Sequence, residues 1–373
     1  MLPQANNPLS ESSIIIANDT RMTQLAIIGA GMAGLAAARA LQQRRPALAI
    51  TVYEKSRGLG GRVATRRRDG FSFDHGAQNV RAPTPALQHL LTSELSTDQL
   101  HDIGLPVWVF DGTGALAAGD PALNAEPKWV YRDGMNRLGK LLAAGIPVRH
   151  EVQVGQVNEL PKPAGGQAQW ALFDNVGTAL GVADAVLFTP PGPQAADLIV
   201  ASALNDDLRQ ALLAELAPVR YRRCISLALA YPQRVERPYY ALLNIDRTHP
   251  ITWLALEHSK APERCPPGTS LLIAQMAPAW SSEHWETAPA ELERLIAPPV
   301  AALLAADLGA PLWSDVQRWR YALPDAGADF ATLNATGSGL FFAGDYTAGL
   351  GRVHLAIESG WRVAEAIEQW LDA

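Results

Sequence analysis

The segment Gly29-Ala30-Gly31-Met32-Ala33-Gly34 has the GxGxxG spacing that binds the pyrophosphate of a dinucleotide. It follows a short apolar run and opens a helical stretch, as this chemistry requires. Gly29 permits a tight turn, Gly31 lets the backbone approach a pyrophosphate, and Gly34 allows close helix–strand packing. The amino end of the helix directs its positive dipole at the phosphates. The alternative is that these glycines only shape an α/β turn.

Glu54 ends the next apolar run and is followed by Lys55. Its carboxylate can accept hydrogen bonds from both hydroxyls of a ribose, and an acidic residue at this place favours an unphosphorylated adenosine ribose. Glu54 and the glycine-rich turn together predict a dinucleotide site.

Three further segments favour FAD over NAD as the dinucleotide. Residues 55–62, which include Gly60-Gly61-Arg62, offer more backbone N–H groups and a guanidinium near the pyrophosphate. Residues 73–78, Phe-Asp-His-Gly-Ala-Gln, place small residues where a flat ring can approach the backbone. Residues 341–345 end in Gly344-Asp345, and the Asp345 carboxylate can bond the ribityl or pyrophosphate part of FAD. The helix that starts at Gly351-Arg352-Val353 can direct its amino end at the pyrimidine ring of the flavin. A domain that binds only nicotinamide dinucleotides would continue into its next helix after Glu54.

Four aromatic side chains have both a functional and a structural interpretation. Trp319, Tyr321 and Tyr346 either line a pocket over the flavin or pack in an aromatic core. His75 lies within residues 73–78, called the flavin segment below, where it either faces the ring or is a buried structural histidine.

The arginines that follow the second glycine cluster also have two interpretations. We place Arg62 near the FAD phosphate. Arg66, Arg67 and Arg68 either attract an anionic dinucleotide or form a solvated basic turn.

Hydrophobic patterns along the chain predict the strands and helices that must position these residues. A strand at 24–28, a helix to about 43 and a strand at 49–53 form a βαβ unit. A last strand at 340–343 leads to a helix at about 353–371. Further strands are predicted at 108–110, 147–160, 169–173, 181–188, 225–230, 239–245, 251–256 and 270–276, and further helices at 83–100, 134–144, 193–217 and 289–306.

This order predicts an α/β fold in which a Rossmann-type FAD-binding domain carries an inserted substrate domain made of an antiparallel sheet and helices. We assign residues 1–22 to a flexible N-terminal tail. We assign 23–82, 134–192 and 338–373 to the FAD-binding domain, and 83–133 with 193–337 to the substrate domain.

Composition excludes several classes of protein. The chain has 373 residues, of which 48% are apolar, and a net charge of −6 that argues against nucleic-acid binding. Cys224 and Cys265 lie far apart, which excludes a disulfide scaffold and a thiolate zinc site, and the histidines show no metal-ligand spacing. Residues 25–38 are too few to span a bilayer, and no signal peptide is evident. We therefore expect a cytoplasmic protein without a metal or a membrane partner.

The sequence resembles the renalase-like flavoproteins, within the broader group of FAD-dependent amine oxidases. The resemblance spans about residue 23 to the C-terminus and is most specific at the two ends. The segments that carry it are 54–62, 64–66 (Ala-Thr-Arg), 74–78, 131–136 (Tyr-Arg-Asp-Gly-Met-Asn), 319–322 (Trp-Arg-Tyr-Ala), 344–345, 351–353 and 359–360 (Ser-Gly).

The resemblance implies an enzyme that oxidises misreduced nicotinamide dinucleotides, the 2- and 6-dihydro isomers, to NAD(P)+ and passes the electrons to O2, giving H2O2. It assigns no catalytic acid or base; its substrate-pocket candidates are Gln78, Trp319, Tyr321 and Tyr346. The residues implied to bind FAD are Gly29, Gly31, Met32, Ala33, Gly34, Glu54, Lys55, Gly60, Gly61, Arg62, Gly76, Ala77, Gln78, Val154 (beside adenine), Gly344, Asp345, Gly351, Arg352 and Val353. No cysteine follows Cys265, in the C-terminal region where monoamine oxidases attach FAD, so we expect non-covalent FAD.

Two departures from the family pattern lie near the substrate face. Asn79-Val80-Arg81 replaces an aromatic run, and Gly349-Leu350-Gly351-Arg352 replaces a Gly-Gly-Arg. Two other functions therefore stay open: an amine oxidase or other FAD-dependent dehydrogenase of the same fold, and a non-catalytic flavin-binding protein that serves assembly or sensing. Hydride transfer from a dihydropyridine needs no protein base, which fits a chain without an evident acid/base motif.

Overall fold

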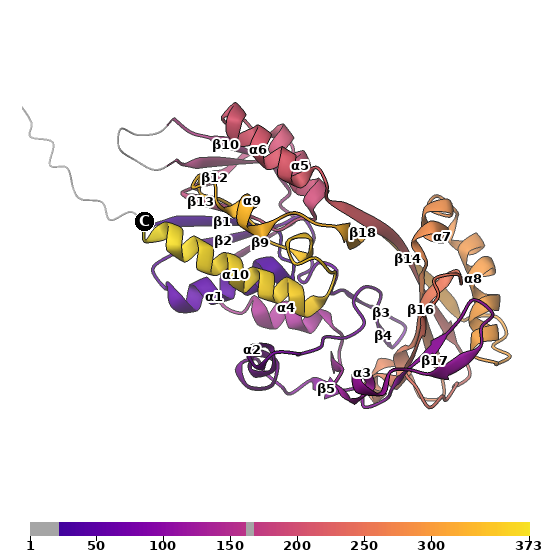
Figure 1. The fold of residues 1–373 in the computed structure, drawn as a ribbon. Helices are drawn as coiled ribbons and strands as arrows, with labels where there is room; N and C mark the ends of the chain where they lie inside the picture. Colours follow the sequence, from indigo (N-terminus) through magenta and orange to yellow (C-terminus); the bar gives the residue numbers. More distant parts are fainter. Residues whose placement is uncertain (1–21, 162–167) are drawn as a thin grey trace, which may run out of the picture.

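The computed structural model of the chain describes residues 22–161 and 168–373 and has two lobes joined by long strands (Figure 1). The N-terminal tail predicted for residues 1–22 lies, except for the exposed Met22, outside the described residues.

A five-stranded parallel sheet forms the centre of the first lobe, in the order β19-β13-β1-β2-β9. Its strands are β1 (Gln24–Ile28), β2 (Ala49–Glu54), β9 (Val148–His150), β13 (Ala185–Phe188) and β19 (Leu340–Phe342). The strands of its centre are almost wholly apolar, as expected where helices cover both faces of a sheet. Helix α1 (Met32–Arg44) joins β1 to β2. The predicted α/β class and its βαβ unit are confirmed.

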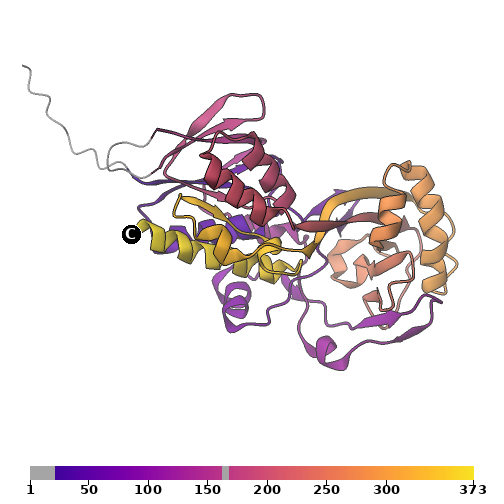
Figure 2. The same cartoon turned by 45° about the horizontal axis from the view of Figure 1, so that its top comes forward.

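Helices cover both faces of this sheet (Figure 2). On one face, α1 packs with α4 (Asn136–Leu142) and α10 (Val353–Leu371). Gly360 brings α10 against α1, since a Cβ there would lie 2.3 Å from the Ala33 carbonyl oxygen.

The opposite face is covered by α5 (Gly192–Ala201) and α6 (Asp206–Leu216), with a three-stranded sheet beside them. That sheet consists of β10 (Val154–Glu159), β11 (Trp170–Asp174) and β12 (Ala179–Ala183). Apolar residues of β13 and β19 contact both helices within one buried cluster. The prediction begins the second substrate-domain segment at residue 193, whereas in the structure α5 and α6 pack on the first lobe.

A seven-stranded sheet forms the second lobe, in the order β18-β14-β17-β16-β15-β6-β7. Its strands are β6 (Val107–Phe110), β7 (Leu116–Ala118), β14 (Arg220–Tyr231), β15 (Ala241–Asn244), β16 (Ile251–Leu256), β17 (Ser270–Met276) and β18 (Trp313–Ala326). All neighbours are antiparallel except β15 and β6. Alternate residues point to opposite faces of the sheet. One face packs against α8 (Pro289–Leu303), with α7 (Pro278–Glu283) near it, and the other turns toward the first lobe (Figure 1).

The other described elements are short. They are the hairpin β3 (Thr65–Arg68) and β4 (Phe71–Asp74), the pair β5 (Leu100–Asp102) and β8 (Trp129–Tyr131), the helices α2 (Pro85–His89), α3 (Pro121–Ala125) and α9 (Phe330–Asn334), the π-helical turn η1 (Leu90–Glu94), and the 3₁₀ turns η2 (Glu257–Ser259), η3 (Pro262–Arg264) and η4 (Asp345–Thr347). No helix of the two described ranges is long and apolar enough to cross a membrane.

Four predicted elements differ from the structure. The strand predicted at 181–188 is two strands, β12 and β13, which lie in different sheets. The helix predicted at 83–100 ends at Glu94, and residues 100–102 form a strand. The strand predicted at 147–160 is two strands in different sheets. The helix predicted at 193–217 breaks in two because the Asn205 side chain accepts hydrogen bonds from the backbone of α6 and starts a new helix.

Candidate functional site

The glycine-rich turn lies between β1 and α1 in the predicted geometry. Gly29 has a φ of +102°, which favours glycine. A Cβ on Gly34 would lie 2.2 Å from the Gly29 carbonyl oxygen, so only glycine fits there without a shift of the chain. A Cβ on Gly31 would meet nothing within 4 Å. Gly31 therefore faces open space at the amino end of α1, as a backbone that binds pyrophosphate must.

The Glu54 carboxylate lies beside this turn and is buried. Its Oε2 accepts a hydrogen bond of 2.8 Å from the Ala30 backbone N–H, and its Oε1 accepts one of 2.8 Å from the Ser56 N–H. Each carboxylate oxygen has a further lone pair, so Glu54 can still accept hydrogen bonds from a ribose. The two backbone donors fix the carboxylate in place.

The second glycine cluster contacts the first. The Gly60 N–H donates to the Ala30 carbonyl over 2.8 Å, and Gly31 and Gly60 form an isolated parallel bridge. Gly60 and Gly61 have φ values of +101° and +60°. A Cβ on Gly61 would lie 3.4 Å from the Gly31 Cα, so a side chain there would narrow the space between the clusters.

The third small-residue segment, Gly76-Ala77-Gln78, is joined to the second. The Ala77 N–H donates to the Arg62 carbonyl over 3.0 Å, and a Cβ on Gly76 would lie 2.0 Å from that oxygen. Backbone hydrogen bonds thus connect the glycine-rich turn at 29–34 with residues 55–62 and 73–78, which are predicted to bind FAD from its adenosine end to its flavin end.

Asp345 brings the C-terminal motif to the same place. Its carboxylate forms a bidentate ion pair with Arg62, with distances of 2.6 Å and 2.9 Å, and accepts a 2.6 Å hydrogen bond from the Tyr221 hydroxyl. Arg62 also donates to the Tyr321 and Ala322 carbonyls. Burial, and then the Asp345 charge, raise the pKa of Tyr221 well above its ordinary value. The structure thus pairs two predicted cofactor residues with each other; their contacts with FAD stay a prediction.

The other predicted cofactor residues occupy the first lobe. Met32 and Ala33 are buried in α1, Val154 is buried at the start of β10, and Lys55 is exposed after β2. Gly344 precedes Asp345 with a φ of +145°, and its N–H donates to the Ser359 hydroxyl. Arg352 is the N-cap residue of α10 and Val353 begins the helix. A Cβ on Gly351 would lie 2.4 Å from the end of the Leu323 side chain, which would have to move.

β18 and β17 of the second lobe contact the flavin segment from the substrate-domain side. The Trp319 indole N–H donates to the His75 carbonyl over 2.9 Å, and the two rings stack with centroids 5.4 Å apart. The Gln275 side-chain amide donates to the Gly76 carbonyl over 2.7 Å. Burial, and then the Arg66 charge, lower the pKa of His75 to about 4, so His75 is neutral at physiological pH. Tyr321 lies next to Tyr221, edge to face at 5.7 Å.

Two substrate-pocket candidates have other roles in the structure. Tyr346 is 1% exposed and packs in the apolar cluster behind the parallel sheet, which favours the core interpretation of this residue over a place at the flavin. Gln78 is 7% exposed, and its amide bonds the Asp74 and Gly76 carbonyls and the Lys260 ammonium. Its side chain is therefore committed to the protein rather than to a substrate.

Sequence reasoning missed a fully buried charged cluster beside this segment. It consists of Asp74, Glu257, Lys260 and Arg264, all 0% exposed. It also missed Tyr221 and Gln275, the partners of Asp345 and Gly76. Asp74 and Arg264 are 190 residues apart in the chain, so no local pattern indicated their contact.

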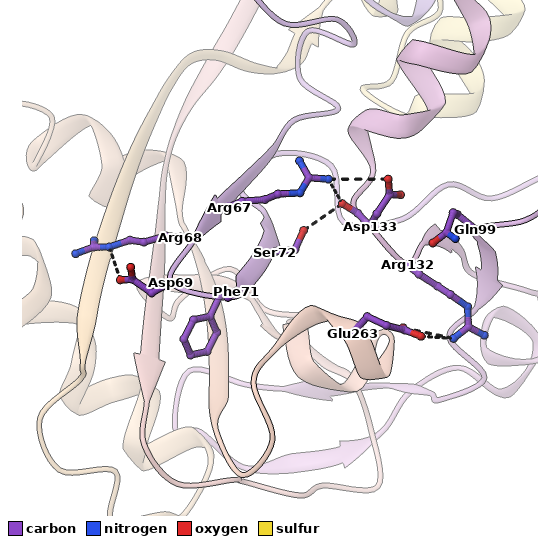
Figure 3. Close-up of a pocket in the computed structure, with 10 residues that line it drawn as sticks. Arg67, Arg68, Asp69, Phe71, Ser72, Gln99, Arg132, Asp133 and Glu263 are labelled. Carbon is purple, nitrogen blue, oxygen red and sulfur yellow. Dashed lines mark hydrogen bonds and ion pairs between the residues drawn. The ribbon is translucent and has the colours of Figure 1, made fainter.

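A cavity of about 500 Å³ lies beside the β3–β4 hairpin (Figure 3), and its lining includes no residue of the glycine-rich turn. Its charged side chains are paired: Arg67 with Asp133, Arg68 with Asp69, and Arg132 with Glu263. Arg66 binds Asp315 and Gln317 of β18. These contacts favour the structural interpretation of the basic turn, which connects β3 to its neighbours.

The matching family model decides the assignment: residues 108–368 match the flavin-containing amine oxidoreductases, and residues 27–93 match an NAD(P)-binding Rossmann-like domain. The chain belongs to the flavin-containing amine oxidoreductase family. It is therefore a flavin-dependent oxidoreductase.

Solved structures of this family share the fold over nearly the whole chain. A provisionally named protoporphyrinogen oxidase from Exiguobacterium sp. 255-15 has a TM-score of 0.74 at 17% identity, covering 93% of this chain and 99% of that one. Cyclohexylamine oxidase from Brevibacterium oxydans has a TM-score of 0.70 at 16% identity, covering 94% and 100%. At these identities the likeness concerns the fold.

Curated relatives match over short stretches. Coproporphyrinogen III oxidase of Staphylococcus aureus is 33% identical over 81 residues, which is 22% of this chain and 16% of that protein. A 4,4'-diapophytoene desaturase of Staphylococcus haemolyticus is 41% identical over 59 residues, 16% of this chain and 11% of the relative. The matches thus span at most about a sixth of these relatives' length.

Proposed function

We propose that this protein is a renalase-like oxidase that uses non-covalent FAD to oxidise 2- and 6-dihydro isomers of NAD(P)H to NAD(P)+, with O2 as acceptor and H2O2 as product. Bound FAD would accept a hydride from the dihydropyridine ring and pass two electrons to O2. We also propose that the enzyme works in the cytosol, as its residue composition suggests.

The residues of the first lobe fit an extended FAD. Gly31 leaves space for a pyrophosphate, and the buried Glu54 carboxylate keeps lone pairs for the adenosine ribose. Gly76 and Ala77 offer backbone without bulky side chains to the flavin. No cysteine follows Cys265, so the C-terminal region where monoamine oxidases attach FAD offers no thiol, which supports non-covalent binding.

The observation that carries the substrate assignment is the positive charge near Arg352. Desolvation, and then repulsion from Arg81 and Arg222, lower the pKa of Arg352, so the three guanidinium groups share one neighbourhood. Glu126 pairs with Arg81, and Asp325 pairs with Arg222. Within 22–161 and 168–373, Arg352 has no carboxylate partner. A cation at this place attracts the phosphates of a dinucleotide and repels a protonated amine.

The state of the titratable groups around the flavin segment also supports hydride transfer. His75 is neutral and stacked on Trp319. Lys260 is bonded to Gln78 and Glu257, and burial raises the pKa of the Cys224 thiol to about 12. None of these groups is poised as a base, and a dihydropyridine that becomes aromatic by losing hydride needs none. The chain's contribution is to orient the ring and to exclude water.

Anaerobic stopped-flow spectroscopy tests the proposal. The purified flavoprotein is mixed with 6-dihydro-NAD, ordinary β-NADH, benzylamine or spermidine, and flavin bleaching is followed. We expect rapid bleaching by 6-dihydro-NAD, slow bleaching by β-NADH, and none by the amines. In air, each oxidised donor should yield one H2O2. Rapid bleaching by an amine without any by the dihydronicotinamide would establish an amine oxidase instead.

A further inference from the structure

The segment from His75 to Val80 leaves the first lobe, and all of its residues except Ala77 are hydrogen-bonded by residues of the predicted substrate domain. The Asn79 side-chain amide donates to the Tyr240 hydroxyl over 3.0 Å, and Val80 exchanges backbone hydrogen bonds with Trp129. Trp319 and Gln275 bond the carbonyls of His75 and Gly76. The backbone predicted to face the flavin is therefore positioned by residues of the substrate domain.

Within 22–161 and 168–373, Lys260 is the only charged side chain that forms a hydrogen bond with this segment. Its side chain is 0% exposed, and its ammonium donates a 2.9 Å hydrogen bond to the Gln78 Oε1 atom. The Gln78 Nε2 atom donates in turn to the Asp74 carbonyl over 2.5 Å and to the Gly76 carbonyl over 3.1 Å. A Lys260–Gln78–Gly76 chain thus runs from the buried ammonium to the flavin-facing backbone.

The charged cluster around Lys260 does not need this lysine to connect its two carboxylates. Arg264 pairs with Asp74 and Glu257, and the Asp74 N–H also donates to Glu257 over 3.2 Å. Lys260 pairs with Glu257 over 2.8 Å and lies 3.7 Å from Asp74. Burying a second cation is costly unless its donors are used. The Lys260 ammonium donates its hydrogen bond outside the cluster to Gln78.

We propose that Lys260 is a positioning residue for the cofactor: it fixes the orientation of the Gln78 amide and thereby the Gly76–Gln78 backbone against the flavin. A hydrogen bond to a charged donor is stronger than one between neutral groups, so it holds one orientation of an amide that otherwise has two. This inference rests on the proposed FAD cofactor and is independent of the dihydronicotinamide substrate.

The test compares Lys260→Met and Gln78→Leu, which remove the same hydrogen bond from opposite ends. We expect each to raise the FAD dissociation constant about tenfold, the size of one lost hydrogen bond, and to shift the visible absorption band of the bound flavin. Because Lys260 acts through Gln78, the double variant should bind FAD no more weakly than Gln78→Leu alone.

Lys128→Met is the matched control. Lys128 is also a buried lysine, 7% exposed, and it bonds the Asn124 and Glu126 carbonyls instead of the flavin segment. Its loss should lower the melting temperature and leave FAD affinity and the flavin spectrum unchanged.

A purely structural role would give a different result for Lys260. Lys260→Met would then lower the melting temperatures of the apoprotein and the FAD-bound protein equally, with an unchanged dissociation constant and spectrum, and the inference would be overturned. If Lys260→Met does not fold, Gln78→Leu decides alone, and wild-type FAD binding by that variant overturns the inference. A wild-type protein that binds no FAD would instead refute the proposed function.

Discussion

Gly31 and Gly34 stand in the same turn, yet the structure gives them different roles that substitution by alanine can separate. Gly31 has a φ of −79° and a ψ of −179°, which any residue can adopt, and its Cβ position is empty. At Gly34 the Cβ would lie 2.2 Å from the Gly29 oxygen and 3.0 Å from the Thr189 hydroxyl. Gly31→Ala should therefore affect binding, and Gly34→Ala should affect folding.

The magnitudes follow from these contacts. Gly31→Ala reduces the freedom of the unfolded chain, which stabilises the fold by about 0.4–1 kcal/mol. It also replaces a glycine N-cap by the poorer alanine, a cost of about 1 kcal/mol. The free energy of unfolding of the apoprotein should thus change by less than about 1 kcal/mol. If the new methyl displaces the pyrophosphate from one backbone N–H, affinity falls by about 1.5–3 kcal/mol, or about tenfold to a hundredfold.

Gly34→Ala must move backbone atoms, and overpacking of this kind costs about 1–3 kcal/mol or more. Urea unfolding of both apoproteins and titration with FAD, followed by flavin fluorescence, measure the two quantities separately. Wild-type FAD affinity in Gly31→Ala would refute the assignment of Gly31 to the pyrophosphate. Equal destabilisation of both apoproteins would refute the packing argument.

Three further predictions concern single side chains. Glu54→Ala should weaken FAD binding by about 1.5–3 kcal/mol in a titration, since it removes a charged acceptor; an unchanged dissociation constant would show that Glu54 does not touch the ribose. Burial and, to a smaller extent, the Arg66 charge lower the pKa of His75 to about 4 in the folded protein, below the ordinary 6.5. As the pH falls, His75 therefore becomes protonated in the unfolded chain before it does so in the folded protein. Stability should decline between pH 6.5 and 4 by up to about 3 kcal/mol. His75→Phe should remove this part of the pH dependence in urea unfolding, and an identical profile would contradict it. Arg352→Gln should raise the KM for 6-dihydro-NAD about tenfold by removing a charge-assisted contact. The control Arg57→Gln, at an exposed position, should leave this KM unchanged. Equal KM values for the two variants would count against a subsite for an anion at Arg352.

The long strand β18 illustrates where sequence patterns fail. Ten of its fourteen residues are half-buried, so its side chains do not alternate between apolar and polar. A search for alternating apolar and polar residues does not detect a strand with this pattern, although this strand carries Trp319 and Tyr321. The strands β16 and β17 and the helix α10 were predicted with their observed bounds because each has one or two clearly buried faces.

The sequence by itself determined those features that form between neighbours along the chain. A strand, a glycine turn, a helix and a second strand ending in Glu54 lie within about thirty residues, and their residue types dictate a βαβ unit with a dinucleotide site. Neighbours along the chain form such a unit without reference to the rest of the molecule. The family resemblance added the flavin segments for the same reason, since each is a short contiguous motif.

Tertiary structure alone decided which motif residues contact one another. Arg62 and Asp345 are 283 residues apart and form an ion pair, and Lys260 and Gln78 are 182 apart and form a hydrogen bond. Tyr346, one residue after Asp345, lies in the core because η4 turns it away from the site. Contacts between distant segments depend on how two sheets and their helices pack, and a buried charge finds its partner only when that packing removes it from water. No local pattern of residues records that choice.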